Sequence, residues 1–174
     1  MKKDQRITEK SSMHVNRLIG LLEDFWNGEK WIDDNLVKKV MHLSEYQVFK
    51  RPLEQLHSVA ELVSHMLVWR EAAIDRILEK PTALSVGTPL DWRKNDVLKE
   101  IGWNSLLQQF EANNLNLISL LKERDDTFLD TSYQEGSTFG NLIEGIVQHD
   151  FYHLGQIGIT IKFLMLKSEA GDTC

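Results

Sequence analysis

The chain has 174 residues and a mass of 20.2 kDa, which fits a single domain whose core needs no disulfide or structural metal. Its 20 basic and 26 acidic residues give a net charge of −6, which disfavours a phosphate backbone, so we expect no nucleic-acid partner. The single cysteine, Cys174, fits a cytoplasmic location, and the absence of a run of ~20 apolar residues argues against a membrane span or a membrane partner.

Apolar residues recur at the three-and-four spacing of amphipathic helices along most of the chain, and no segment shows the alternation of a strand. Asn27-Gly28, Pro52 and Pro81 indicate helix boundaries, and we expect a break at Gly102 in the third long helix. The predicted helices run, in chain order, over residues 11–28, 35–43, 53–78, 95–124 and 137–167.

Four of these helices are long, which predicts an all-α fold, a four-helix bundle with long connections. The long connections leave open an up-down-down-up order of helix directions. We expect one domain over residues 11–167, a mobile charged segment at 1–10 and a polar tail at 168–174. The apolar residues of the helix over 53–78 cover a wide arc, which suggests contacts with a second subunit and hence a homodimer.

The last long helix contains two histidines four residues apart, His149 and His153. At about 100° per residue, the two rings project within roughly 40° of each other, which is the spacing of paired metal ligands on a helix. Both lie in the apolar seam, where imidazole nitrogens need a partner. The pair therefore predicts a metal site, and the alternative is a pair of hydrogen-bonded core histidines.

Two imidazoles hold a metal weakly, and a catalytic zinc site usually has three protein ligands. The polar tail offers only carboxylates beyond the helix, so the third ligand should come from another helix. Of the other histidines we choose His65, which lies mid-helix among apolar neighbours, over His57, which faces the polar side. His65 lies about 110° from the centre of the apolar arc of its helix, at the margin of that face.

A set of residues resembles the DinB/YfiT-like family over nearly the whole chain: residues 58–66, Trp69, Asp91-Trp92, Trp103 and residues 149–157. The resemblance implies a four-helix bundle, commonly dimeric, with a divalent metal held by three histidines, here His65, His149 and His153. Relatives include bacillithiol-dependent thiol S-transferases, a mycothiol-dependent maleylpyruvate isomerase and proteins described as metal-dependent hydrolases. One departure is Leu154, where many relatives carry a basic residue, which puts the substrate class in doubt.

The first functional hypothesis is a metal-dependent enzyme of the thiol S-transferase or hydrolase type acting on a small-molecule substrate. Imidazole ligands favour zinc, with nickel, iron and copper as alternatives, and a low-molecular-weight thiol would be a second cofactor. The nucleophile would be a metal-bound water or thiolate. Position on the helices suggests substrate contacts from Gln156, Tyr152 and Trp69, with Trp92 as a further candidate.

Two other hypotheses compete with this one. The stretch from His149 to His153 resembles the H-E-x-x-H motif of zinc peptidases, with Asp150 in the place of the general base. The other is a non-catalytic metal-binding dimeric bundle with a stress-related role. Glu61 lies one turn before His65, where its carboxylate could orient that ring through a hydrogen bond. The alternative is that Glu61 is a solvated helix residue.

Overall fold

The computed structural model describes residues 11–29 and 33–171, most of which are helical. The predicted segment 1–10 and residues 172–174 of the predicted tail lie outside the described residues. The long helices are α1 (Met13–Trp26), α4 (Val59–Ile77), α6 (Trp103–Lys122) and α8 (Phe139–Gly171). The shorter elements are α2 (Leu36–Val40), α3 (Glu45–Phe49), α5 (Asn95–Ile101), α7 (Asp126–Leu129) and an antiparallel pair of strands, β1 (Ser132–Gln134) and β2 (Ser137–Thr138).

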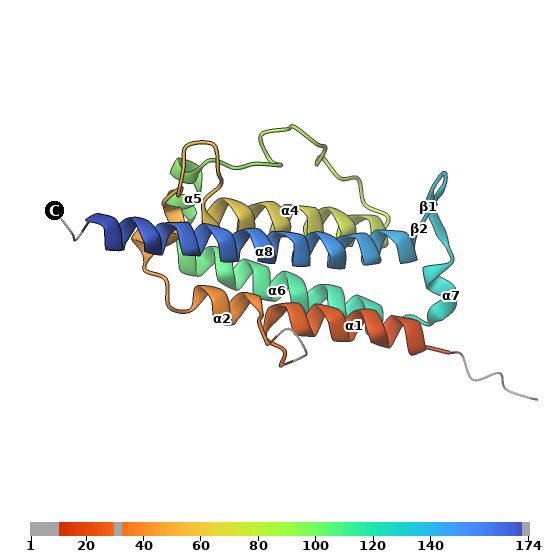
Figure 1. Ribbon diagram of the computed structural model, residues 1–174. Helices are drawn as coiled ribbons and strands as arrows, with labels where there is room; N and C mark the ends of the chain where they lie inside the picture. The colour runs from red at the N-terminus through yellow and green to blue at the C-terminus, as the bar shows by residue number, and fades with distance from the viewer. Residues whose placement is uncertain (1–10, 30–32, 172–174) are drawn as a thin grey trace, which may run out of the picture.

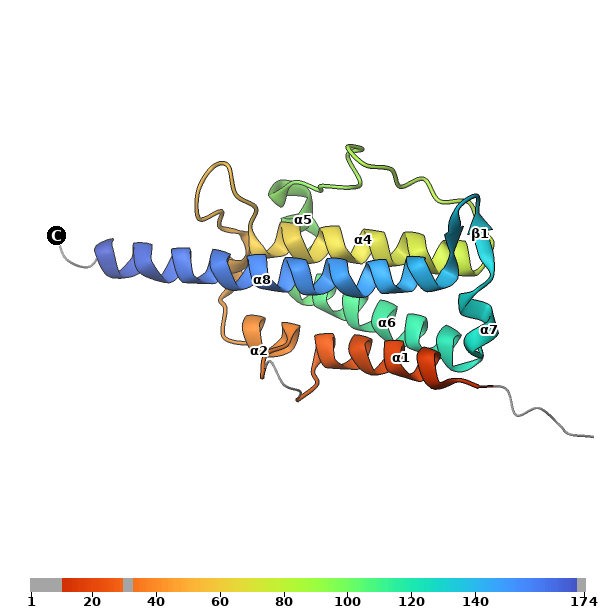
Figure 2. The ribbon, with the colours of Figure 1, turned by 45° about the vertical axis from the view of Figure 1, so that its right-hand side comes forward.

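The four long helices form a bundle in which α1 and α8 run in one direction and α4 and α6 in the other (Figures 1 and 2). This up-down-down-up order confirms the predicted fold class. Because α4 and α6 are parallel, residues 78–94 must return along the length of the bundle before α5 begins. That return segment passes beside α4 and brings its own side chains to the functional site.

The helix predicted over 53–78 begins later, at Val59, because its start is fixed by a capping box. Ser58 has an extended backbone and its hydroxyl accepts a bond from the Glu61 N–H, while the Glu61 carboxylate accepts one from the Ser58 N–H. The resulting helix α4 packs against α8, α6, α3 and α5, and most of its residues are buried. Its wide apolar arc is thus covered within one chain, and the predicted homodimer rests on the family resemblance alone.

The predicted break at Gly102 is confirmed, since its φ of 83° separates α5 from α6. Four elements were not predicted: α3, α7 and the two paired strands β1 and β2, each only a few residues long. The strands have no buried residue, so they carry none of the alternation that would reveal them. At the other end, α8 continues to Gly171, four residues beyond the predicted end at Lys167.

The core consists of two hydrophobic clusters along the bundle axis. One is built around Leu62, Met66, Phe110 and Ile157, and the other around Leu22, Ile74, Leu117 and Ile143. Burial of these side chains is the main force that holds the helices together, at about 25 cal/mol per Å² of apolar surface. Within the described part of the chain, no helix is both long enough and apolar enough to cross a bilayer.

Candidate metal centre

The three predicted ligands meet between α4 and α8. His65 Nε2 lies 3.0 Å from His149 Nε2, which in turn lies 3.1 Å from His153 Nε2. One ring nitrogen of each residue lies within 4.8 Å of the others, as a common ion would require. His65 and His153 are buried and His149 is half-buried. His65, predicted to lie at the margin of the apolar face, is only 6% exposed because α4 is covered on nearly all sides.

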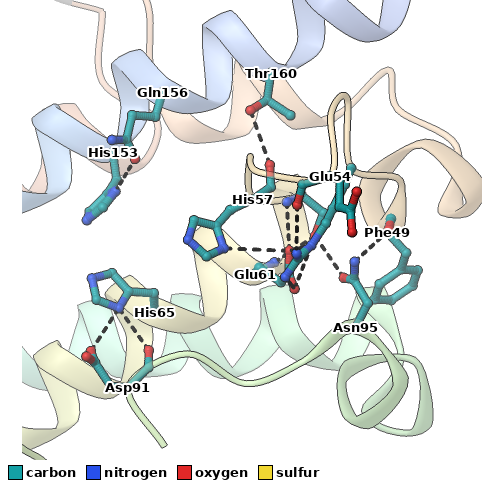
Figure 3. Close-up of polar contacts among 12 residues, drawn as sticks. Phe49, Glu54, His57, Glu61, His65, Asp91, Asn95, His153, Gln156 and Thr160 are labelled. Atoms are coloured by element: carbon teal, nitrogen blue, oxygen red, sulfur yellow. Dashed lines mark hydrogen bonds and ion pairs between the residues drawn. The ribbon is translucent and has the colours of Figure 1, made fainter. Parts of the chain in front are cut away.

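The orientation of His65 is set by Asp91 of the return segment (Figure 3). His65 Nδ1 lies 2.9 Å from the Asp91 carbonyl oxygen and 3.1 Å from its carboxylate Oδ1. Asp91 is held in turn by the Trp69 indole N–H at 2.8 Å and by the Gly87 backbone N–H at 3.0 Å. Burial alone would raise the pKa of Asp91, but these two bonds and the neighbouring imidazoles of His65 and His149 together lower it, so the carboxylate is ionised.

These bonds fix where the protons lie on the rings. His65 donates from Nδ1 to Asp91, so the Nε2 of a neutral ring carries a lone pair. His153 likewise donates from Nδ1 to Gln156 Oε1 at 2.7 Å, which leaves a second lone pair on its Nε2 (Figure 3). Both lone pairs point at His149 Nε2, which can donate a proton to only one of them.

The hydrogen-bond demands of the three rings therefore cannot all be met by one another. The remaining nitrogen of His149, Nδ1, is buried and has no hydrogen-bond partner within the described structure. This disagrees with the alternative of ordinary hydrogen-bonded core histidines, which would satisfy each buried nitrogen. Three convergent nitrogen donors with outer bonds to Asp91 and Gln156 fit the ligand set and supporting shell of a divalent cation.

The electrostatics keep the rings neutral. Burial lowers the pKa of His65, and it lowers the pKa of His149 to about 3 and of His153 to about 4. Repulsion from neighbouring imidazoles adds to the effect: from His153 and His65 on His149, from His65 and His57 on His153, and from His57 on His65. Neutral imidazole is the form that coordinates a metal. At pH 7 the cluster therefore offers its lone pairs without any proton having to leave first.

An aromatic stack supports the outer face of His65. The Trp92 ring lies between His65 and His57, with centroid distances of 3.8 Å on both sides and interplanar angles of 6° and 9°. His57, expected on a polar face, is in fact half-buried in this stack. Trp92 was considered as a substrate contact, and here one face of its ring packs on a candidate ligand. The stack fixes the plane of the His65 ring.

Asp150 does not occupy the position of a general base. Its side chain is fully buried and paired with Arg70, with Oδ2 3.0 Å from Nε and 2.7 Å from Nη2 of the guanidinium. Arg70 also donates from Nη1 to Asn114 Oδ1 at 2.8 Å, so the pair links α4, α8 and α6. A carboxylate held in this way inside the bundle cannot reach a substrate at the histidines, which weighs against the zinc-peptidase hypothesis.

The suggested contact residues have different surroundings. Gln156 bonds to His153 and Trp69 bonds to Asp91, so both support the candidate ligands. Tyr152 is 63% exposed beside the His153 ring, and it is free to meet a substrate. Glu61 does not orient His65, because its carboxylate is buried in an ion pair with Arg51 and bonded to the Ser58 N–H.

Asp91 is one of the residues that resemble the family, but the sequence predicts no role for it. Its part in the site depends on the path of residues 78–94, which have no periodic pattern from which their position could be derived. The adjacent Trp92, predicted only as a substrate contact, lies in the same irregular segment. Only the pairing of an acidic residue with a tryptophan in an otherwise irregular segment could have drawn attention to them.

Comparison with known proteins gives two matches. The chain matches the sequence profile of the DinB superfamily over residues 31–157, and no match was found among curated proteins. Its fold is similar to that of the colibactin self-resistance protein ClbS, solved in complex with double-stranded DNA, with a TM-score of 0.58 and 17% identity. The likeness covers 86% of this chain and 91% of that chain, and at this identity it shows a shared fold.

The ClbS complex corrects one prediction. The net charge of −6 led us to exclude nucleic acid as a partner, and that exclusion is wrong for this fold, since a protein that shares it was solved with double-stranded DNA. An overall negative charge describes the sum over the surface, whereas contact with a phosphate backbone depends on the charges of one face.

Proposed function

The chain belongs to the DinB superfamily, and we propose that it is a divalent-metal-dependent enzyme of the thiol S-transferase or hydrolase type. The observation that carries the proposal is the convergence of three Nε2 atoms whose lone pairs cannot satisfy one another. His65, His149 and His153 would hold the ion. Zinc is the first candidate, because imidazole ligands suit it well.

A divalent cation at this position supplies Lewis acidity, which can generate a nucleophile from water or a thiol at neutral pH. The protein contributes orientation: Asp91 and Gln156 fix the ring tautomers, and Trp92 fixes the plane of His65. The three ligands are neutral, so they leave the charge of the ion undiminished. This ligand set therefore favours activation of a nucleophile over simple structural support.

Access to the centre supports catalysis over a purely structural site. A structural metal site is usually closed, whereas a catalytic one keeps a position open. His65 and His153 are buried, but His149 is half-buried and the neighbouring Tyr152 is 63% exposed. The side of the cluster nearest to these two residues is thus the approach for a small molecule.

Metal analysis tests the proposal directly. We expect the purified protein to bind one divalent ion per chain, and His149→Ala to lose that ion and any thiol-transfer or ester-hydrolysis activity. His42→Ala is the matched control, because His42 is exposed and outside the cluster. Equal metal content in the His149→Ala and His42→Ala variants would contradict the assignment. Full metal loading without turnover of any thiol, electrophile or ester would favour the non-catalytic alternative.

Double-stranded DNA is a second candidate partner, favoured by the ClbS complex. The surface we choose for it is a hollow lined by Tyr46, Phe49, Lys50 and Lys99 together with one acidic residue, Glu45. Tyr46 is 71% exposed and the Lys50 ammonium lies 5.2 Å from its ring centroid. Fluorescence anisotropy with a labelled duplex at low salt tests this. Binding that falls steeply with salt and is lost in Lys50→Glu/Lys99→Glu would support it, and binding unaffected by that double change would exclude this surface.

A further inference from the structure

A small cavity lies close to the histidine cluster, between α4, α8 and the loop that precedes α4. It has a volume of about 190 Å³ and mainly apolar walls, and it is bounded by Leu56 and His57 before α4, by Leu62 on α4 and by Gln156 and Ile159 on α8. Figure 3 shows His57 and Gln156 on the two sides of this region, close to His65 and His153. Nothing in the metal-centre chemistry itself requires such a cavity.

The cavity lies about one helical turn from the candidate ligands, between the same two helices. Leu62 precedes His65 by three residues on α4, and Gln156 follows His153 by three residues on α8. Because α4 and α8 are antiparallel, these two steps lead in the same direction, about one helical turn or ~5 Å along the helices. Gln156 belongs to both places, since it lines the cavity and accepts the bond from His153.

The cavity is preformed, because its loop wall is fixed on several sides. The Thr160 hydroxyl donates to the His57 carbonyl at 3.4 Å, and Lys167 Nζ donates to the Pro52 carbonyl at 2.6 Å, which ties residues 52–57 to α8. Arg51 pairs with Glu61 on α4, with Nε 2.9 Å from Oε2. The loop therefore has little freedom to fall into the space.

Several polar groups of the walls are turned to protein partners, and Leu56, Leu62 and Ile159 supply apolar surface for a ligand. The Thr160 hydroxyl is used by His57, the Gln156 carbonyl oxygen is used by His153, and one face of the His57 ring is covered by Trp92. No charged side chain lines the cavity among the described residues. An ionic group would lose its hydration there without compensation.

We propose that this cavity binds a short apolar group, an alkyl chain or a small ring, of a substrate whose reacting end lies at the three histidines. The assignment rests on the proposed function and adds its substrate class. Burial of the chain tightens binding by about fourfold per methylene, which makes butanethiol bind roughly 15-fold tighter than ethanethiol.

The test is calorimetric titration of the zinc-loaded protein with ethanethiol, propanethiol and butanethiol. We expect the affinity to rise along the series in the wild type. Ile159→Trp fills the cavity from an exposed position and should abolish the rise while leaving the ethanethiol affinity unchanged. Leu166→Trp, two turns further along α8 and also exposed, is the matched control and should keep the rise.

The outcomes separate the two proposals. Equal affinities along the series in a metal-loaded protein that binds thiols would overturn the cavity assignment alone, as would an unchanged rise in Ile159→Trp. Failure of the wild type to bind zinc would overturn the metal centre and the cavity together. In the wild type, the methyl resonances of Ile159 should shift with butanethiol and not with ethanethiol, which reports occupancy independently of activity.

Discussion

Loss of the Asp150 charge should destabilise the bundle strongly, because Asp150 and Arg70 are both completely buried. Asp150→Asn keeps the shape of the side chain but removes the countercharge from a guanidinium that contacts Oδ2 through both Nε and Nη2. The rings of Phe25 and Phe110, 5.4 and 4.8 Å from the guanidinium carbon, offer only weak compensation.

The size of the effect follows from the unpaired charge that remains. Removal of one partner of a buried ion pair costs about 3–5 kcal/mol. For a chain of this length each kcal/mol lowers Tm by about 2–4 °C, so Asp150→Asn should melt roughly 6–20 °C below the wild type. Replacement of both partners by apolar residues, Arg70→Met with Asp150→Leu, removes both charges and should recover most of that loss.

Urea denaturation of the metal-free protein, with a chelator present, measures this effect without a contribution from the metal centre. Burial raises the pKa of Asp150 to about 6 against the pull of Arg70, so the assay belongs at pH 8, where the carboxylate is ionised. Asp130→Asn, at an exposed aspartate, is the control. A loss below about 1 kcal/mol for Asp150→Asn would refute the reasoning, since it would mean that the pair contributes no more than a surface salt bridge.

Three further predictions concern other parts of the chain. Asp91→Ala should weaken zinc affinity by about 10- to 100-fold in a competition assay with a chromophoric chelator, while Asp96→Ala should leave it unchanged. The pKa of Glu61 is lowered to about 2, since the contact with His57 and the hydrogen bonds from Arg51 and Ser58 outweigh the effect of burial, so it stabilises the fold above pH 4.5. That stabilisation, about 3 kcal/mol at most, should be lost as the pH falls from 4.5 to 2, and Glu61→Gln should show a smaller fall over this range in urea titrations. Gly102→Ala should lower the free energy of unfolding by about 1–3 kcal/mol, because a φ of 83° is strained for any other residue. Gly145→Ala, in open space within α8, should raise it by about 0.5–1 kcal/mol, and thermal melting measures both changes.

The spacing of apolar residues was enough to predict the long helices and the pairing of His149 with His153, because both depend on the helical repeat alone. His65 was harder to assign. A helical wheel places a residue relative to the mean apolar direction, but α4 is covered by neighbours on nearly all sides, so that direction does not identify the bundle axis. The residue predicted at the margin is therefore buried.

The supporting residues of the site could not be derived from periodicity. Asp91 and Trp92 lie in the irregular segment between α4 and α5, and they reach His65 only because the parallel arrangement of α4 and α6 forces that segment back along the bundle. Glu61 shows the opposite case. It lies one turn from His65, but its carboxylate accepts hydrogen bonds from the Ser58 N–H of the capping box and from Arg51. A position close to His65 along the helix therefore did not predict a role in the site, whereas Asp91 and Trp92 gain theirs from the path of a loop.

The failed exclusion of nucleic acid has a similar physical origin. Net charge sums the ionised side chains over the whole chain, and without the Arg70–Asp150 and Arg51–Glu61 pairs the sum is still −6. The sum does not show on which face the remaining charges lie. What a duplex would meet is one face, such as the hollow with Lys50 and Lys99, and counterion release from a few phosphates there can outweigh distant acidic groups at low salt. Exclusion of a partner class from composition therefore requires the surface distribution of charge, which helix spacing alone does not supply.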